Sequence, residues 1–132
     1  MKGFFTNIEN ATKENNDFRR VLYTGKNSQL VLMSLKPNEE IGEEVHETID
    51  QFFRFEVGQG KAIIDGNEYE ISDGVALIVP AGARHNIINT SSDTPLKLYT
   101  IYSPPNHKDG LVRLTKEEAE MNEEHFDGKT TE

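Results

Sequence analysis

The stretch Gly74-Val-Ala-Leu-Ile-Val-Pro80-Ala-Gly82-Ala-Arg-His85-Asn-Ile-Ile-Asn89 decides the fold. Its first half, residues 75–79, is apolar and predicts a buried strand, after which Pro80 and Gly82 impose a tight turn. His85 follows that turn and opens a second predicted strand. Rigid backbone orients a histidine at the start of a strand, and a sheet presents a metal ligand or an acid/base group in this way. The alternative is a half-exposed histidine in a hairpin with no chemical role.

A second informative stretch lies earlier in the chain, at residues 44–58. Glu44 and His46 are two positions apart, and on a strand such residues point to the same face of the sheet. Gln51 opens the next predicted strand, so side chains from two strands can meet that of His85 from a third. A carboxylate, two imidazoles and an amide carbonyl together suit a divalent metal ion.

Other roles are open for each of these residues. His46 and His85 are otherwise core or surface histidines, and Glu44 is otherwise a solvated carboxylate at a strand end. Gln51 is otherwise a hydrogen-bond donor to a backbone group near the mouth of a barrel. Further acidic residues flank Glu44, and mutual repulsion in such a cluster raises the pKa values of its members. A bound divalent cation would remove that repulsion, which favours the metal site.

Residues 74–89 resemble the second sequence motif of the cupin superfamily at every fixed position: Gly, five residues, Pro, one residue, Gly, two residues, His, three residues, Asn. The first cupin motif has a His-x-His pair, then Glu, then Gly seven residues after that Glu. Residues 44–58 are similar to it, with Glu44 in place of the first histidine and Gln51 in place of the glutamate. Asn38 stands where the motif opens with Gly.

This resemblance covers about residues 30–104 and implies an all-β fold, the double-stranded β-helix or jelly-roll barrel of the cupins. Carried over position by position, it implies that the metal ligands are Glu44, His46, Gln51 and His85. Both replacing residues can donate an oxygen, which leaves the metal open among Zn²⁺, Mn²⁺, Fe²⁺ and Ni²⁺. The mixed ligand set is similar to the metal centre of isomerases of the mannose-6-phosphate type.

The pattern of segments fits one all-β domain. Alternating and apolar segments bounded by turn residues predict short antiparallel strands in a sandwich or barrel. These segments are residues 18–23, 29–35, 40–45, 51–57, 61–64, 69–71, 75–79, 85–90 and 96–102. The expected divisions of the chain are an N-terminal extension at 1–17, the barrel at 18–112, and a C-terminal helix and tail at 113–132.

Both ends of the chain carry helical signals. One helical turn is predicted at residues 7–14. Thr115 and Glu118 fit a capping box, which predicts a helix over residues 116–124. Residues 129–132 are predicted to be disordered.

The composition narrows the classes of partner. The 132 residues include 23 acidic and 14 basic ones, for a net charge of −9. Such a surface argues against nucleic acid and anionic membranes as partners. The absence of cysteine excludes disulfides and thiolate metal sites. No apolar stretch approaches the ~18–20 residues of a membrane span, and the first residues lack the apolar core of a secretory signal, so a cytoplasmic protein is expected.

Candidates for acid/base chemistry lie near the end of the barrel: Tyr99, Tyr102 and His107. Pro104 and Pro105 stiffen the exit of the last strand, and His107 follows two residues later. We expect Tyr102 and His107 to be the catalytic residues, with His107 over the barrel mouth. The alternative is an exposed loop histidine without a role.

The expected function is that of a metal-dependent enzyme acting on a small polar molecule such as a sugar. The resemblance implies an isomerase-like reaction that moves a proton between adjacent carbons. A basic cluster for a phosphate group is missing from the motifs, which argues against a sugar phosphate. Two histidines and a carboxylate also match the ligands of non-haem iron oxygenases. The remaining alternatives are a barrel that binds a metal or small ligand without turnover, and an empty barrel with a structural role.

A homodimer is expected from the edges of the sheets, because unpaired edges are usually covered. Phe4, Phe5 and Phe18 supply apolar side chains that can cross to a second chain. The alternative is that these phenylalanines fold back onto their own barrel.

Overall fold

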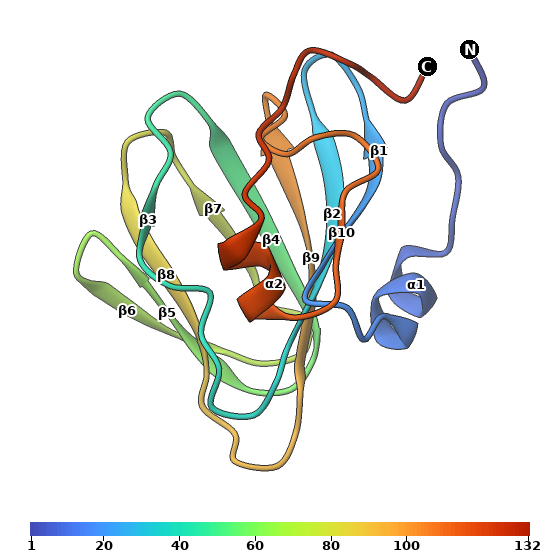
Figure 1. Cartoon of the computed structure of the whole chain (residues 1–132). Coiled ribbons are helices and arrows are strands. Elements are labelled where there is room, and N and C mark those ends of the chain that lie inside the picture. The colour runs from blue at the N-terminus through green and yellow to red at the C-terminus, as the bar shows by residue number, and fades with distance from the viewer.

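The computed structural model describes residues 1 to 132 and consists mainly of two antiparallel sheets that face each other (Figure 1). The larger sheet has the strand order β10-β1-β2-β9-β4-β7, and the smaller has the order β3-β8-β5-β6. The strands are β1 (Arg19–Thr24), β2 (Gln29–Leu35), β3 (Glu44–Val45), β4 (Asp50–Val57), β5 (Gly60–Ile64), β6 (Asn67–Ile71), β7 (Ala76–Val79), β8 (Arg84–Asn89), β9 (Leu96–Ser103) and β10 (Val112–Arg113). The helices are α1 (Ile8–Glu14) and α2 (Lys116–Met121). The predicted all-β jelly-roll barrel is confirmed.

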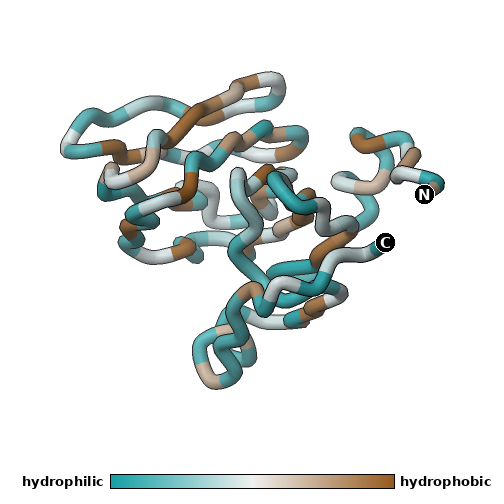
Figure 2. Tube along the Cα trace, turned by 90° about the horizontal axis from the view of Figure 1, so that it is seen from above, coloured by the Kyte–Doolittle hydropathy of each residue, from teal (hydrophilic) through white to brown (hydrophobic).

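The core lies between the two sheets and follows the period-two alternation of strands. In β2, Val31, Met33 and Leu35 are completely buried on one face. Phe53 and Phe55 of β4 are buried too, and their rings stack with centroids 6.2 Å apart. Figure 2 shows apolar residues recurring along the strands, whereas most of the turns are hydrophilic. Burying a side chain of this size stabilises the fold by about 1.5–3 kcal/mol, so these rows hold the central strands in place.

Left-handed backbone conformations explain several turn residues. Asp65 and Gly66 have φ values of 46° and 81°, and they join β5 to β6 in the hairpin that the sequence predicted. Asn38, where the cupin motif has Gly, has φ 63°, a conformation that Asn tolerates better than most residues. Gly58 has φ 100°, and a Cβ there would lie 2.4 Å from the carbonyl oxygen of Pro95. Only glycine fits at residue 58.

The strand predicted at residues 40–45 forms only in part. Glu40 makes a single bridge to Ile88, and a regular strand resumes at β3. Between them Gly42 has φ 106°, which breaks the extended run. The break separates β3 from the chain before it, so Glu44 begins a short strand of its own against β8.

Both helices occur where the sequence predicts them, and α2 is shorter than expected. The Thr115 side chain accepts a hydrogen bond from Glu118 N at 3.1 Å, as the capping box requires. The helix ends at Met121 rather than residue 124, because Asn122 leaves the helical conformation. Arg113 holds the chain there by donating to the Asn122 carbonyl at 3.1 and 2.7 Å. Helix α1 packs on the outer face of the larger sheet, against β9, β4 and β2 (Figure 1).

The prediction of disorder at residues 129–132 is wrong. Thr131 N donates to the Thr24 carbonyl at 2.9 Å, and Thr24 N donates back to Thr131 Oγ1 at 2.8 Å. The Glu132 carboxylate accepts hydrogen bonds from Tyr23 and from the backbone of Lys2 and Gly3. The two termini therefore lie close together (Figure 1). These contacts join segments more than 100 residues apart, so no local pattern reveals them.

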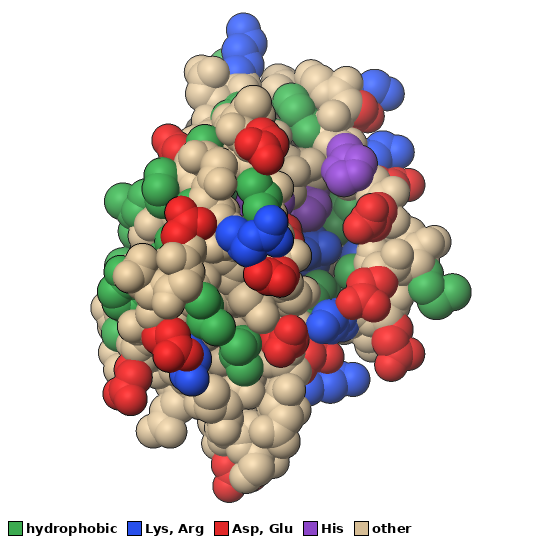
Figure 3. All heavy atoms as spheres, turned by 90° about the vertical axis from the view of Figure 1, so that its left-hand side faces the viewer, with side chains coloured by type: hydrophobic (Ala, Val, Ile, Leu, Met, Phe, Trp, Pro, Cys, Tyr) green, Lys and Arg blue, Asp and Glu red, His purple; other side chains and the backbone are tan.

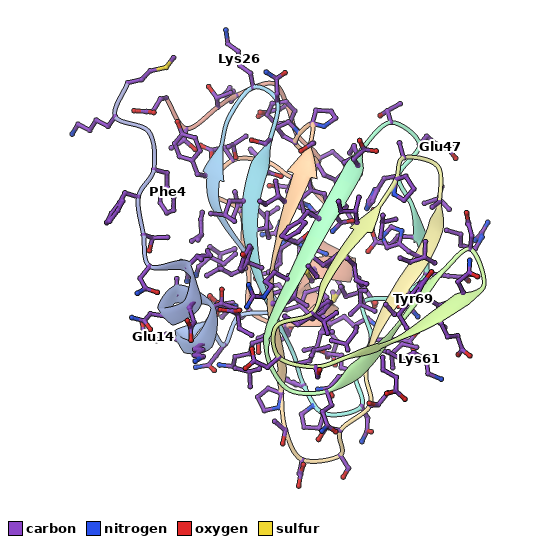
Figure 4. All side chains as sticks on the ribbon, turned by 180° about the vertical axis from the view of Figure 1, so that it is seen from behind. Phe4, Glu14, Lys26, Glu47, Lys61 and Tyr69 are labelled. Carbon is purple, nitrogen blue, oxygen red and sulfur yellow. The ribbon has the colours of Figure 1, made fainter.

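The phenylalanines at the N-terminus separate into two groups. Phe18 is 4% exposed and belongs to the core of its own barrel, so the expectation that it crosses to a second chain is wrong. Phe4 lies against Tyr23 of β1, with ring centroids 5.7 Å apart (Figure 4), while Phe5 is 99% exposed. Neither helix has the length and apolar character needed to cross a membrane.

Candidate functional site

Strand pairing brings the sequence-predicted site residues to one end of the barrel. Glu44 of β3 is paired with His85 of β8, so the two side chains share a face of the smaller sheet. Gln51 of β4 is paired with Tyr102 of β9 on the larger sheet. His46 follows β3, and its ring centroid lies 5.5 Å from that of His85 and 5.9 Å from that of Tyr102.

Glu44 and His46 form a close pair with an unusual geometry. Glu44 Oε2 lies 3.0 Å from His46 Nε2. Nε2 is buried, and the Glu44 carboxylate is the polar group next to it. Burial raises the pKa of Glu44, but contact with His46 and the positive charge of Arg19 outweigh it, so the net pKa is lowered and the carboxylate is ionised. A carboxylate oxygen and an imidazole nitrogen this close together can be two ligands of one cation.

His85 is oriented to offer a lone pair. Its Nδ1 lies 3.2 Å from the carbonyl oxygen of Ala83, so Nδ1 carries the proton and donates it, leaving Nε2 unprotonated. Burial lowers the pKa of His85 and favours this neutral form. A hydrogen bond from the other ring nitrogen to a backbone carbonyl fixes the ring of a metal-binding histidine in this way.

Gln51 also presents an unused atom. It is 3% exposed, and its Nε2 donates to Thr100 Oγ1 at 2.9 Å. Thr100 in turn donates to the Phe52 carbonyl at 2.8 Å, which fixes the direction of the amide. The carbonyl oxygen Gln51 Oε1 is then buried with no partner. The alternative role of Gln51 as a donor to backbone is wrong, because its partner is a side chain.

These donors suit a divalent metal ion chemically, although the side chains do not enclose one. No three His, Cys, Asp or Glu side chains lie close enough together to hold a metal ion. Glu47, beside His46, is exposed on the turn and points away from the barrel (Figure 4). The buried atoms without partners, His46 Nε2 and Gln51 Oε1, are those that a cation would satisfy.

Tyr102 and His107 form a buried pair next to these donors. Tyr102 Oη lies 3.1 Å from His107 Nε2, and the two rings are nearly perpendicular at 87°. Gln29 fixes the loop by accepting from His107 N at 2.9 Å and donating to its carbonyl at 2.7 Å. His107 is 9% exposed, so its interpretation as an exposed loop histidine is wrong. Tyr99 lies on the opposite face of β9, near Phe52, and is not part of the site.

The protonation states of this pair follow from burial. Burial lowers the pKa of His107 well below its usual value, and the positive charges of Arg19 and His46 lower it further. Burial raises the pKa of Tyr102 to about 12. A neutral imidazole therefore faces a protonated phenol across a hydrogen bond.

Sequence reasoning missed Arg19, which also faces the site. It shares the inward face of β1 with buried Val21, whereas Arg20 points outward and pairs with Asp17 at 2.8 Å. Arg19 lies over the ring of Phe18 at 5.2 Å, and its Nε is buried without a hydrogen-bond partner. A charged residue in the inward register of a strand is a signal that the sequence does contain.

A pocket of about 480 Å³ opens onto the site. Its lining includes Arg19, Glu44, His46 and His107, together with residues of α2 and of the segment after it. Figure 3 shows a face on which histidine side chains reach the surface among acidic and basic ones. The volume lies in the range of small-molecule sites.

A family model described as "Cupin domain" matches residues 31–102 of the chain. The chain belongs to the cupin family. This cupin is 48% identical over 124 residues to YrkC, an uncharacterized protein of Bacillus subtilis (strain 168), with 89% of the chain and 66% of YrkC covered. It is 40% identical over 116 residues to L612, an uncharacterized protein of Acanthamoeba polyphaga mimivirus, with 86% of the chain and 72% of L612 covered.

A similar solved structure is that of BH2720 from Bacillus halodurans. It has 42% sequence identity to this cupin and a TM-score of 0.89. The match covers 92% of this chain and 96% of that one. The similarity therefore extends beyond the cupin motifs to nearly the whole chain, including regions outside the barrel.

Proposed function

We propose that this cupin is a metal-dependent enzyme that acts on a small polar molecule by transferring a proton. Glu44, His46 and His85 would hold a divalent metal ion, with Gln51 Oε1 as a further oxygen donor. The observation that carries this proposal is the pair of buried atoms without partners, His46 Nε2 and Gln51 Oε1. Leaving such atoms unsatisfied costs about 1–3 kcal/mol each, which a ligand between them would offset.

The donor set suits Zn²⁺, Mn²⁺, Fe²⁺ or Ni²⁺, since it combines imidazole nitrogen with oxygen and contains no thiolate. When bound, such an ion polarises a carbonyl or hydroxyl oxygen of the substrate. The ligands do not decide among these metals, because each metal accepts the same atoms.

Tyr102 and His107 are the groups that would move the proton. The neutral His107 accepts a proton, and Tyr102 lies between it and His46. The phenol is the protonated member of the pair and can donate a proton to the substrate, whereas its raised pKa and the lowered pKa of His107 disfavour transfer from Tyr102 to the imidazole. This pairing supports an isomerase-like reaction, in which a proton moves between adjacent carbons of a hydroxycarbonyl compound, with Tyr102 and His107 as the catalytic residues.

The ligand chemistry supports one second candidate. Two histidines and one carboxylate are the set used by non-haem iron oxygenases, and Glu44 with His46 and His85 supplies it. That candidate requires iron and gives Tyr102 and His107 no necessary part. A cupin that binds metal without turnover uses the same ligands and leaves the Tyr102–His107 pair without a role.

Deuterium exchange separates these candidates. Metal-loaded protein is incubated in D₂O with small hydroxyaldehydes and hydroxyketones, and proton NMR follows loss of the C–H signal next to the carbonyl. Exchange that stops on removal of metal, and in Tyr102→Phe and His107→Gln while metal content is unchanged, is the expected result. Tyr69→Phe, at an exposed tyrosine on β6 outside the pocket, is the matched control. Metal-dependent oxygen uptake without exchange would favour the oxygenase, and bound metal with neither would favour a binding protein.

A further inference from the structure

Among the five arginines of the chain, Arg19 alone lacks a carboxylate partner. The other arginines each have an acidic residue nearby, in the pairs Arg20–Asp17 at 2.8 Å, Arg54–Glu56 at 3.2 Å, Arg84–Glu43 at 3.8 Å and Arg113–Glu124 at 3.8 Å. Arg19 is also the arginine that points into the barrel and lines the pocket beside Glu44 and His46. A guanidinium without an ion-pair partner thus lines the same pocket as two of the proposed metal ligands.

We propose that Arg19 binds a carboxylate of the substrate, so that the substrate class is small monoanionic hydroxy or keto acids. The proposal rests on the proposed function, because it places the acid in the pocket next to the metal ligands. Arg19 Nε is buried without a hydrogen-bond partner, and an unsatisfied buried donor is unfavourable. A bound carboxylate would provide that partner.

The surroundings of Arg19 leave the edge of its guanidinium able to bind a planar group such as a carboxylate. The ring of Phe18 lies 5.2 Å from Arg19 Cζ and covers one face of the guanidinium. Stacking of this kind leaves the edge of the group, with its N–H donors, free for a planar acceptor. Arginine binds a carboxylate in this edge-on, two-point manner.

The charge of the pocket favours a ligand with one negative charge over a ligand with two. Five glutamates line it, against the cations Arg19, Arg113 and Lys116. Arg113 is committed to the Asn122 carbonyl, and Lys116 lies 3.8 Å from Glu120. Arg19 is the cation left to attract an anionic ligand, and each further negative charge on that ligand adds repulsion from the surrounding carboxylates, which disfavours a phosphate dianion.

Arginine side-chain NMR can test this assignment directly, because the chain has few Nε–H signals to resolve. The probes are lactate, glycerate and gluconate, with the uncharged lactamide and sorbitol as counterparts, and inorganic phosphate. In metal-loaded protein, at least one acid is expected to shift the Arg19 Nε–H signal while the other arginine signals stay in place. The uncharged compounds are expected to leave it unmoved.

Calorimetry supplies the affinities. Arg19→Gln is expected to weaken binding of that acid by at least about tenfold, the loss of a charge-assisted hydrogen bond, and Arg19→Lys to restore part of it. Arg20→Gln, at the outward arginine next in sequence, is the matched control and should bind like the wild type. Metal content and the proton NMR spectrum of each variant show that site and fold persist.

Three outcomes would overturn the assignment: no acid shifts Arg19, phosphate shifts it more than every acid, or Arg19→Gln binds the acid as tightly as the wild type. If deuterium exchange on uncharged hydroxycarbonyl compounds still depends on metal and on His107, the proposed function survives the loss of this inference. If Arg19 binds acids in protein that takes up no metal, this inference survives and the proposed function is overturned.

Discussion

At the scale of residues, the site consists of atoms that the fold leaves without partners. His46 Nε2 and Gln51 Oε1 are buried and unpaired, although buried polar atoms in proteins are nearly always hydrogen-bonded. Thr100 holds the Gln51 amide in the orientation that leaves Oε1 free, and Ala83 does the same for Nε2 of His85. The neighbours of the site therefore select the free atoms, and those atoms are of the kinds that bind metals.

Replacement of Glu44 tests its place among the ligands. Glu44→Gln removes the only carboxylate next to the two histidines, and metal affinity is expected to fall by about 10- to 100-fold. Glu43→Gln is the matched control, since Glu43 is exposed and pairs with Arg84 instead. Competition titration with a chromogenic chelator measures both. Equal affinities in the two variants would mean that Glu44 is not a ligand.

His107 predicts a pH dependence of folding in metal-free protein. Burial holds its pKa well below the usual value, so the unfolded chain takes up a proton at about pH 6.5 that the folded chain refuses. Stability is then full above that pH and falls by up to about 1.4 kcal/mol per pH unit below it, until the folded pKa is reached. His85, whose pKa is also lowered, contributes part of the same slope.

Urea unfolding at about pH 7 and pH 5 measures this slope. His107→Gln is expected to flatten it. A slope in His107→Gln equal to that of the wild type would show that His107 is protonated as easily in the folded chain as in the unfolded one.

At the scale of elements, α2 and the loop of residues 106–107 position the pocket. Helix α2 is short, so its stability depends on the Thr115 cap at one end and on Arg113 at the other. Both ends are fixed to residues that belong to or adjoin β10, and β10 is paired with β1, which carries Arg19. Loosening α2 should therefore affect the pocket before it affects the core.

Thr115→Ala tests this dependence. Loss of the cap is expected to cost about 1 kcal/mol locally and to speed amide hydrogen exchange in α2, with little change in the core strands. Thr6→Ala is the control, because Thr6 is exposed and makes no hydrogen bond. Faster exchange spread evenly over the strands would show that α2 is an integral part of the core instead.

The sequence predicted those elements whose formation depends on residues close together in the sequence. The Asp65-Gly66 turn, the capping box of α2 and the alternation in β2 and β4 all involve residues close in sequence. The sequence did not predict β10, because Val112 and Arg113 become a strand only by pairing with β1. Likewise, motif register placed Glu44, His46, Gln51 and His85 at one end of the barrel, whereas the partners Thr100 and Gln29 come from distant strands and could not be predicted.

At the scale of the whole molecule, the remaining question is assembly. Phe5 is almost fully exposed, and the N-terminal segment that carries it runs along the outside of the barrel beside β1 (Figure 4). An exposed aromatic side chain on an extended segment suits contact with a second chain. Phe18, buried in the core, has no part in this.

Light scattering is expected to give a mass of twice the 14.9 kDa of one chain at micromolar concentration. Phe5→Glu should lower that mass by placing a charge in the contact, while Tyr69→Glu, at an exposed aromatic residue on β6, should not. A wild-type mass of 14.9 kDa would exclude the dimer.

The metal content of the purified protein tests the central claim most directly. After reconstitution with Zn²⁺, Mn²⁺, Fe²⁺ or Ni²⁺ and removal of free metal, mass spectrometry is expected to find about one divalent ion per chain in the wild type. His46→Ala and His85→Ala should each lose it and remain folded, since the sheets are held together by the apolar side chains between them. Metal content in the His46→Ala/His85→Ala double variant equal to that of the wild type, or none in the wild type with any of these metals, would contradict the account.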